Sequence, residues 1–304
     1  MDTLSNKENI KETMNIIRQW NYLTKPIFLI SVSILLFLQL VNGQEIVFKE
    51  VNLSEEDNND FVTGIAQDLN GLMWFSTKVG LLSYDGNMLT SYKNIPINPN
   101  SLASNFTETV YADFNGKLWI GTLGSGLDHF DPESGLVTHF RHDPEDPSSL
   151  SSDTVTQVLR DQQGVLWVGT HGGLDRFDPE TGKFDHYRSI PDDNTTISHN
   201  QVRVLYEDSR GTLWIGTGSP YLDNGGGPDG GGLNRMDSKT ETFTRYMHDP
   251  EDKNSLVSNK IGAIYEDDQG VLWIGTGNNG LHRMTQQRGT LDRLLYDPEN
   301  PNQF

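Results

Sequence analysis

A seven-residue pattern recurs five times along this chain and restricts its possible folds more than any other feature. The pattern is Asp-x-x-Gly-x-x-Trp, and each copy continues with an apolar residue, then Gly or Ser, then Thr. The copies are Asp68, Gly71 and Trp74; Asp113, Gly116 and Trp119; Asp161, Gly164 and Trp167; Asp208, Gly211 and Trp214; and Asp267, Gly270 and Trp273. Successive tryptophans of the pattern lie 45, 48, 47 and 59 residues apart. Periods of about 40–50 residues with regular aromatic and glycine positions indicate propeller blades or solenoid repeats.

The third repeat shows how one unit divides into strands. Residues 155–159 alternate apolar and polar side chains, which is the period of a half-buried strand. Asp161 to Gly164 has the residue types of a type I turn, and residues 165–170, 173–177 and 184–187 supply three further short strands. Four antiparallel strands per repeat predict an all-β fold, a β-propeller of four-stranded blades with five units present. We expect each motif tryptophan to fill the space between neighbouring blades.

The C-terminus of the chain predicts an incomplete propeller. Residues 296–302 begin another connecting segment, and the chain ends at Phe304 before a next first strand. Five blades would leave strand edges unpaired, and such edges favour aggregation. We therefore expect at least two further blades beyond these residues.

The N-terminus has the pattern of an export signal. Residues 27–41 form an uncharged apolar run of 15 residues, preceded by Lys25. This length suits the core of a signal peptide better than a membrane span, which needs about 20 residues. Val41 and Gly43 fit a cleavage site, so we expect a signal peptide at 1–43 and the propeller at 44–304. Met14 is a candidate true start, because the segment that follows it is basic and lacks acids before the apolar run.

Composition excludes several classes of function. The net charge is −19, which argues against binding to nucleic acid or to anionic lipid. The chain has no cysteine, so disulfides, zinc–thiolate sites and a cysteine nucleophile are excluded. No hydrolase, metalloprotease or phosphate-loop motif is present, and we expect no catalytic residue, no metal site and no cofactor. The acidic loops 142–147 and 248–253 leave weak calcium binding as an alternative to ordinary solvated acids.

Candidate ligand-binding residues come from the loops that vary between repeats. In an up-and-down blade, the connections between strands 2 and 3 share a face with those between blades, and variable loops on a rigid scaffold carry function. We expect the face with the tight turns between strands 1–2 and 3–4 to be uniform. The fourth repeat has an insertion between strands 2 and 3, which explains its longer spacing. The candidates are Lys78, His171, Tyr221, Asp223 and Asn278, and the alternative is that all five are only solvated loop residues.

The repeat resembles that of a known family. Residues 149–187 read SLSSDTVTQVLRDQQGVLWVGTHGGLDRFDPETGKFDHY, which is similar to the two-component regulator propeller repeat. The resemblance covers roughly residues 60–304, and its first copy departs with Ser76 in place of Gly and Val79-Gly80 in place of Gly-Gly. It implies a seven-bladed propeller, often one of two in tandem. In this family the propellers precede an immunoglobulin-like domain, a membrane helix and a cytoplasmic histidine kinase, or in some cases a diguanylate cyclase.

The resemblance implies the extracytoplasmic sensor of a membrane-bound two-component protein. Its expected partner is a small molecule or an oligosaccharide, its expected location is the periplasmic side of the inner membrane, and a homodimer is a further expectation. Membrane attachment, kinase activity and the phosphorelay would belong to a part of the protein beyond this chain. Three alternatives stay open: an exported or anchored propeller that only binds a protein or glycan, the sensor of a diguanylate cyclase, and a propeller lyase. A lyase would need a histidine and a carboxylate that converge on the central channel.

Overall fold

The five repeats fold into five separate sheets. The computed structural model describes residues 61–218, 230–277, 280–285 and 289–294, all within the compact unit Leu53–Phe304. These residues form twenty strands in five four-stranded sheets, and within each sheet neighbouring strands are consecutive in the chain. No helix in the described ranges is long and apolar enough to cross a membrane. The all-β fold of four-stranded propeller blades predicted from the repeat is therefore confirmed.

The blades follow the sequence repeats in order. The first blade consists of β1 (Val62–Gln67), β2 (Met73–Thr77), β3 (Gly80–Tyr84) and β4 (Leu89–Tyr92). The second consists of β5 (Thr107–Ala112), β6 (Leu118–Thr122), β7 (Leu127–Asp131) and β8 (Leu136–Phe140). The third consists of β9 (Val155–Arg160), β10 (Leu166–Thr170), β11 (Leu174–Asp178) and β12 (Lys183–Tyr187).

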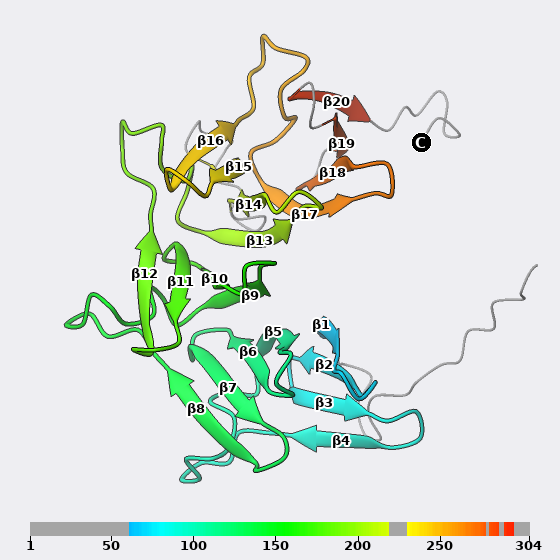
Figure 1. Cartoon of the computed structure of the whole chain (residues 1–304), viewed down its shortest axis with the longest axis vertical. Coiled ribbons are helices and arrows are strands. Elements are labelled where there is room, and N and C mark those ends of the chain that lie inside the picture. The colour runs from blue at the N-terminus through cyan, green and yellow to red at the C-terminus, as the bar shows by residue number, and fades with distance from the viewer. Residues whose placement is uncertain (1–60, 219–229, 278–279, 286–288, 295–304) are drawn as a thin grey trace, which may run out of the picture. The chain divides into compact units, whose positions relative to one another are not determined.

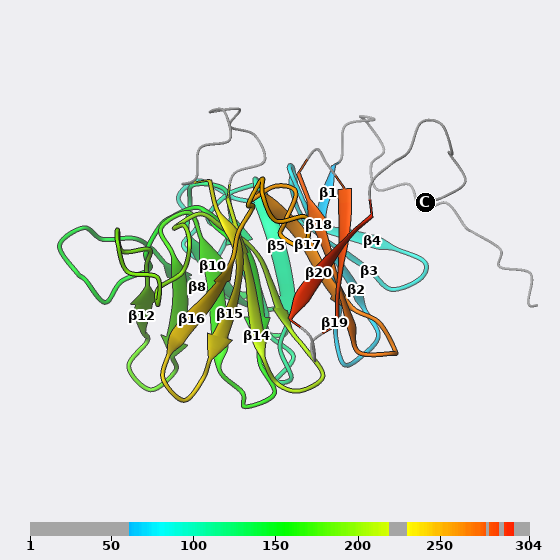
Figure 2. The same ribbon diagram turned by 90° about the horizontal axis from the view of Figure 1, so that it is seen from above.

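The last two blades repeat this arrangement. The fourth consists of β13 (Val202–Glu207), β14 (Leu213–Thr217), β15 (Gly232–Asp237) and β16 (Thr242–Tyr246). The fifth consists of β17 (Ile261–Glu266), β18 (Val271–Thr276), β19 (Gly280–Thr285) and β20 (Thr290–Leu294). The first strands of successive blades contact one another and face a common centre, while the fourth strands lie at the periphery (Figure 1). Seen from above, the strands run between two faces made of turns and loops (Figure 2).

The repeated Asp-x-x-Gly-x-x-Trp motif builds the turn between strands 1 and 2. In the third blade, the Gly164 N–H donates to the Asp161 carbonyl oxygen at 2.9 Å, and Gly164 has a φ of +86° that favours glycine. One oxygen of the Asp161 carboxylate accepts the N–H groups of Gln163 and Val165, at 3.0 and 2.8 Å. The other oxygen accepts the indole N–H of Trp167 at 2.8 Å. The aspartate therefore fixes both the turn and the orientation of the tryptophan.

The motif tryptophans fill the joints between blades. Four of them are at most 5% exposed, and each belongs to a cluster that includes apolar residues of the following blade. Trp214, for example, shares a cluster with Ile261 and Ile264 of the fifth blade. In the second, third and fourth blades, the Gly two residues after the tryptophan leaves room for this contact: a β-carbon on Gly216 would lie 2.5 Å from Ile261 Cγ2.

The first and fifth blades each expose one face of their sheet. Val62 and Ile65 of β1 are 39% and 60% exposed, whereas Val202 and Leu205 at the same positions of β13 are 0% and 2% exposed. In the fifth blade, Trp273 is only half-buried. The described part of the chain has no blade before β1 and none after β20, so these residues lack the neighbour that buries their counterparts.

Each loop between two blades is fastened to the outer strands of the following blade. In the loop between β8 and β9, the Ser148 carbonyl accepts the N–H of Phe184, which lies in β12. The N–H of Ser151 donates to the buried carboxylate of Asp175 in β11 at 2.8 Å. Between these two anchors the side chain of Leu150 is fully buried. The loops therefore hold successive blades together from outside the sheets.

Candidate functional site

The loops between strands 2 and 3 and the loops between blades lie on the same face. The Leu123 N–H donates to the Phe106 carbonyl at 3.0 Å, and the Gly124 N–H donates to the Asp153 carbonyl at 3.0 Å. These bonds join a hairpin of the second blade to the ends of two interblade loops. The hairpins between strands 2 and 3 and the loops between blades therefore share one face, as the up-and-down order of the strands predicts. We call it the loop face.

The motif threonine fixes the hairpins that carry Lys78 and His171. In the third blade, the Thr170 hydroxyl donates to the Gly173 carbonyl at 3.0 Å and accepts the Gly172 N–H at 2.9 Å. In the first blade, the Thr77 hydroxyl donates to the Gly80 carbonyl at 2.8 Å. Side-chain hydrogen bonds thus hold the backbone of these two hairpins, which carry Lys78 and His171.

Lys78 lies at the tip of the first hairpin. Its side chain is exposed, and its ammonium group lies 4.7 Å from the centre of the Phe61 ring. This distance is that of a cation–π contact. A positive charge beside an aromatic ring is thereby available on the loop face of the first blade.

His171 lies at the corresponding place of the third blade and is half-buried. Its N–H donates to the Thr154 carbonyl at 3.0 Å, so the end of the preceding interblade loop sets its position. Burial lowers the pKa of His171, and the charges of Arg203 and His199 lower it further. A neutral imidazole beside a guanidinium can both accept and donate hydrogen bonds at neutral pH.

The other three predicted residues cannot be placed in this way. Tyr221, Asp223 and Asn278 lie outside the described residues. For Lys78 and His171, which the structure does describe, no interaction joins the two side chains, which belong to different blades. The five candidates therefore stay predictions, and so does the signal peptide at 1–43, which also lies outside the described part of the chain.

A cavity lies at the centre of the blades, and sequence reasoning predicted none of the residues that line it. It has a volume of about 570 Å3 and is lined by residues of β1, β5, β9, β13 and β17. The second residue of each of these strands lines it, and these residues are Thr63, Glu108, Thr156, Arg203 and Gly262. One sequence signal could have indicated this cavity. At the second position of the first strand in each blade, the residue is charged in two blades (Glu108 and Arg203) and small and neutral in the other three. The cavity therefore offers polar groups of both charges to a ligand.

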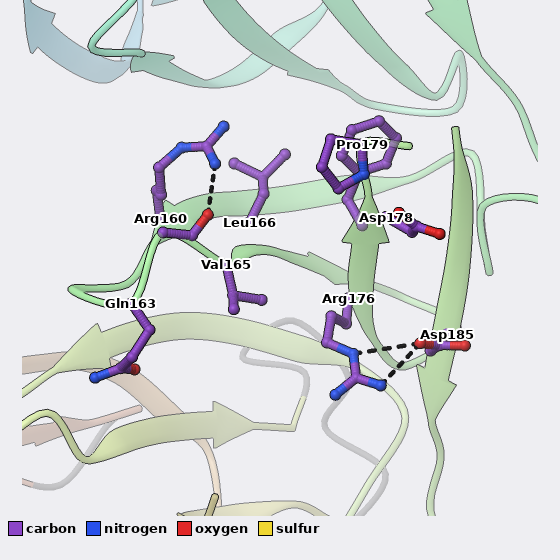
Figure 3. Close-up of a pocket in the computed structure, with 10 residues that line it drawn as sticks. Arg160, Gln163, Val165, Leu166, Arg176, Asp178, Pro179 and Asp185 are labelled. Atoms are coloured by element: carbon purple, nitrogen blue, oxygen red, sulfur yellow. Dashed lines mark hydrogen bonds and ion pairs between the residues drawn. The ribbon is translucent and has the colours of Figure 1, made fainter. Parts of the chain in front are cut away.

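The opposite face is not uniform, contrary to the sequence expectation. A pocket of about 490 Å3 lies beneath the third blade between its two turns, with Arg160 and Arg176 in its lining (Figure 3). Arg160 donates two hydrogen bonds to the Asp113 carboxylate of the second blade, at 3.1 and 2.8 Å. Arg176 pairs with Asp185 at 2.9 Å and with Glu241 of the fourth blade at 2.6 Å. Both cations are therefore engaged in ion pairs, two of which bridge blades.

The acidic loops use their carboxylates internally. Asp143 accepts the N–H of Glu145 at 2.9 Å, and Asp146 accepts the N–H and hydroxyl of Ser148 at 2.9 and 2.6 Å. Asp249 accepts the N–H of Glu251 in the same way at 2.9 Å. In the ranges that the structure describes, no three His, Asp or Glu side chains form a group that could hold a metal ion.

The fold and the central cavity define this chain as a segment of a β-propeller with four-stranded blades. Residues 149–172, 196–219 and 255–278 match the sequence profile of the two component regulator propeller. Three of the five repeats thus match the two component regulator propeller, and the resemblance seen in the sequence is confirmed for these segments. No curated protein matches the chain in sequence.

One similar solved structure is that of an extracellular domain. The extracellular domain of a hybrid two component system from B. thetaiotaomicron is 26% identical with a TM-score of 0.51. The match covers 83% of this chain but 37% of that chain, so this chain spans well under half of its relative.

Two further structures share the fold at low identity. Virginiamycin B lyase from Staphylococcus aureus is 15% identical with a TM-score of 0.56, over 83% of this chain and 75% of that chain. PorZ, a surface component of the type-IX secretion system of Porphyromonas gingivalis, is 16% identical with a TM-score of 0.54, over 84% and 35% of the two chains. At these identities the likeness concerns the fold alone.

Proposed function

We propose that this chain is the ligand-sensing extracellular part of a two-component signalling protein. The observation that carries the proposal is the match of three repeats to the two component regulator propeller, together with the similarity to an extracellular domain of a hybrid two component system. The proposed ligand is a small molecule or an oligosaccharide. Membrane attachment and histidine kinase activity would be supplied by parts of the protein beyond this chain.

The proposed ligand-binding site is the loop face at the mouth of the central cavity. Lys78 and His171 lie on hairpins of this face, and Tyr221, Asp223 and Asn278 belong to loops that the topology assigns to the same face. Sugars are bound by aromatic faces combined with convergent donors and acceptors. Tyr221 would supply the aromatic face, and the ligand would change the geometry between blades or between two copies of the chain.

Export of the chain is part of the proposal. A relative described as an extracellular domain favours an exported protein, in accord with the signal peptide expected at 1–43. We further propose a position on the periplasmic side of the inner membrane, from which a membrane helix would transmit the signal to a kinase. An output through a diguanylate cyclase, and a propeller that binds a protein or glycan without any kinase, are the alternatives.

A lyase function is less well supported by the cavity. The chemistry would need a histidine and a carboxylate that converge on the centre, as acid and base for proton transfer. Among the described residues, the cavity lining includes the carboxylate of Glu108 but no histidine. The likeness to virginiamycin B lyase extends to the fold, and the cavity favours binding over catalysis.

The proposal is tested by binding and by signalling. A panel of oligosaccharides is titrated calorimetrically against the chain and against the variants His171→Ala, Lys78→Ala and Tyr221→Ala. Lys239→Ala is the matched control, because Lys239 is exposed in the turn between β15 and β16 on the opposite face. We expect one oligosaccharide to bind, with weaker binding in the three variants and unchanged binding in the control.

The signalling test uses the longer protein that carries this chain. The ligand found by calorimetry should change its autophosphorylation when it is added on the outer side of membrane vesicles. Binding without any change in phosphorylation would contradict the kinase proposal and favour a propeller that only binds. Equal loss of binding in Lys239→Ala and in His171→Ala would contradict the assignment of the loop face.

A further inference from the structure

Two interblade loops are each held by a histidine of the following blade, and both ring nitrogens of each histidine contact an acceptor oxygen. In the second blade, His139 Nδ1 lies 2.6 Å from the Asp128 carboxylate, and His139 Nε2 lies 3.0 Å from the Pro99 carbonyl. In the third blade, His186 Nδ1 lies 2.7 Å from the Asp175 carboxylate, and Nε2 lies 2.9 Å from the Pro147 carbonyl. Pro99 and Pro147 belong to the loops that precede these blades.

This geometry requires one proton more than a neutral imidazole beside a carboxylate ion. A carbonyl oxygen and an ionised carboxylate accept hydrogen bonds but cannot donate them. The ring must therefore donate from both nitrogens, or the carboxyl group must carry the proton and donate it to Nδ1. In both cases the histidine and aspartate together hold the extra proton, and its loss leaves two acceptors facing each other.

The aspartates of these pairs are buried and also hold the loop. The side chains of Asp128 and Asp175 are fully buried. Asp128 accepts the N–H of Ala103 at 2.7 Å, and Asp175 accepts the N–H of Ser151 at 2.8 Å. Burial raises the pKa of Asp128 against the opposing effect of the Ala103 hydrogen bond. Each loop is thus bound by a carboxylate at one point and by an imidazole at the next.

The fourth and fifth blades hold their loops at the same positions without a protonated histidine. Asn234 replaces the aspartate and accepts the Ser198 N–H at 2.8 Å, while Arg245 replaces the histidine and donates to the Thr196 carbonyl at 2.7 Å. In the fifth blade, His282 accepts the Val257 N–H at its Nε2, so this ring is neutral there. Burial lowers the pKa of His282.

An arginine also occupies the strand-4 position of the fifth blade. Arg293 donates to the Ser255 carbonyl at 2.8 Å. An N–H donor of a strand-4 side chain therefore reaches the loop carbonyls in four blades. It belongs to an arginine, which does not titrate in the ordinary pH range, in two of them, and to a histidine in the other two.

We propose that the pair His186–Asp175 is a proton-dependent latch, which holds the interblade loop 141–154 at acidic and neutral pH and releases it as the pH rises. The loops 188–201 and 247–260 are held by the arginine arrangement and stay closed over the same range.

The charged groups around His186 are consistent with this behaviour. The side chain of His186 is 13% exposed and faces Asp175 from β11, while Arg188 lies just after the end of β12. The hydrogen bond to Asp175 raises the pKa of His186, and burial and Arg188 oppose this rise.

The latch of the third blade reaches the candidate ligand-binding face. The loop 141–154 ends at Thr154, whose carbonyl accepts the N–H of His171. The hydroxyl groups of Ser151 and Thr170 are 2.6 Å apart, so the same loop supports the hairpin that carries His171. Release of the loop at higher pH would therefore loosen this hairpin. The latch itself needs no ligand, and its test is independent of the proposed function.

The test measures amide hydrogen exchange in the full chain at several pH values. The N–H groups of Ser151 and Ser198 are matched, because each donates to the strand-3 residue that holds its loop. We expect the protection of Ser151 relative to Ser198 to fall as the pH rises from about 6 to 9. Linkage makes opening about tenfold more favourable for each unit by which the folded pKa exceeds the unfolded value. A ratio that stays constant over this range would overturn the proposal.

Two variants and one direct titration complete the test. In Asp175→Asn the third blade acquires the amide that the fourth blade has at Asn234, and the ratio should become independent of pH. In His186→Arg the loop should stay closed at high pH, as it does over the fourth blade. If a variant fails to fold, the NMR titration of His186 in the unmodified chain decides the matter: a pKa at or below the ordinary histidine value would contradict the latch.

Discussion

Replacing Gly216 with alanine tests whether the joints between blades are as closely packed as the structure shows. A β-carbon at this position would lie 2.4 Å from Val204 Cγ1 and 2.5 Å from Ile261 Cγ2. Favourable contacts between carbon atoms are about 3.5–4.0 Å, so both neighbours would have to move. Val204 and Ile261 are 9% and 1% exposed and lie in strands of two different blades, which leaves them little room.

The expected cost of Gly216→Ala is that of overpacking a well-packed core, about 1–3 kcal/mol. For a domain of this size, each kcal/mol lowers the melting temperature by about 2–4 °C. The assay is urea denaturation followed by tryptophan fluorescence, because the motif tryptophans lie in the joints. The midpoint of the transition should fall while its slope stays unchanged, which would indicate a loss of stability without a change in the surface exposed on unfolding.

Gly275→Ala is the matched control, because Gly275 occupies the same position of the fifth blade. A β-carbon there would lie 3.4 Å from Ala263 Cβ, its nearest neighbour, which is an ordinary contact. The replacement should be neutral or stabilise the chain by up to about 1 kcal/mol, because it restricts the unfolded chain. Equal losses in Gly216→Ala and Gly275→Ala would refute the packing argument. In a longer protein with a sixth blade, Gly275→Ala should become more costly than it is in this chain, but less costly than Gly216→Ala, because Ala263 stands where the fourth blade has Val204.

Three further predictions concern the interactions that fix the blades. Arg160→Met should lower the free energy of unfolding by about 3 kcal/mol, because it leaves the buried Asp113 without its counter-charge. Arg283→Met, which removes only an exposed ion pair, should lower it by less than about 1 kcal/mol, and urea denaturation compares the two variants. Asp208→Ala should cost about 1–3 kcal/mol in the same assay, since it leaves a buried indole N–H without an acceptor. The pKa of His186 is raised above 6.5, so its stabilising effect is complete below this value and is lost as the pH rises through the folded-state value. The urea midpoint should therefore fall with rising pH by more in the unmodified chain than in His186→Arg, and parallel pH profiles would contradict the assignment.

The repeat motif predicted the blades because its residues act locally. Asp161 and Gly164 define a tight turn through bonds within five residues of each other, and the strands on either side follow from alternation of apolar side chains. The first and last residues expected for the four strands of the third repeat each lie within one residue of the observed bounds. Sequence reasoning did not foresee that the aspartate also accepts the indole N–H, because that bond depends on the side-chain orientation across the turn.

The candidate site was harder to predict because it depends on contacts between blades. The central cavity is lined by residues of five strands that lie far apart in the sequence. That Arg203 places its charge in this cavity can be seen only once β13 is positioned beside β9. Likewise, nothing in the sequence distinguishes Arg160 from other strand residues, yet it forms an ion pair with Asp113 of the preceding blade. Pairings over nearly one repeat length carry no local signal in a single sequence.

The fastening of each interblade loop to the following blade gives the assembly a direction. The first blade has Leu82 and Ser91 at the positions where later blades hold a loop, so it lacks the side chains that perform this task. During synthesis, each loop would emerge from the ribosome before the strands that hold it, and it would stay open until the next blade is complete. The blades would thus assemble in order from the N-terminus, and each new blade would fix the loop that precedes it.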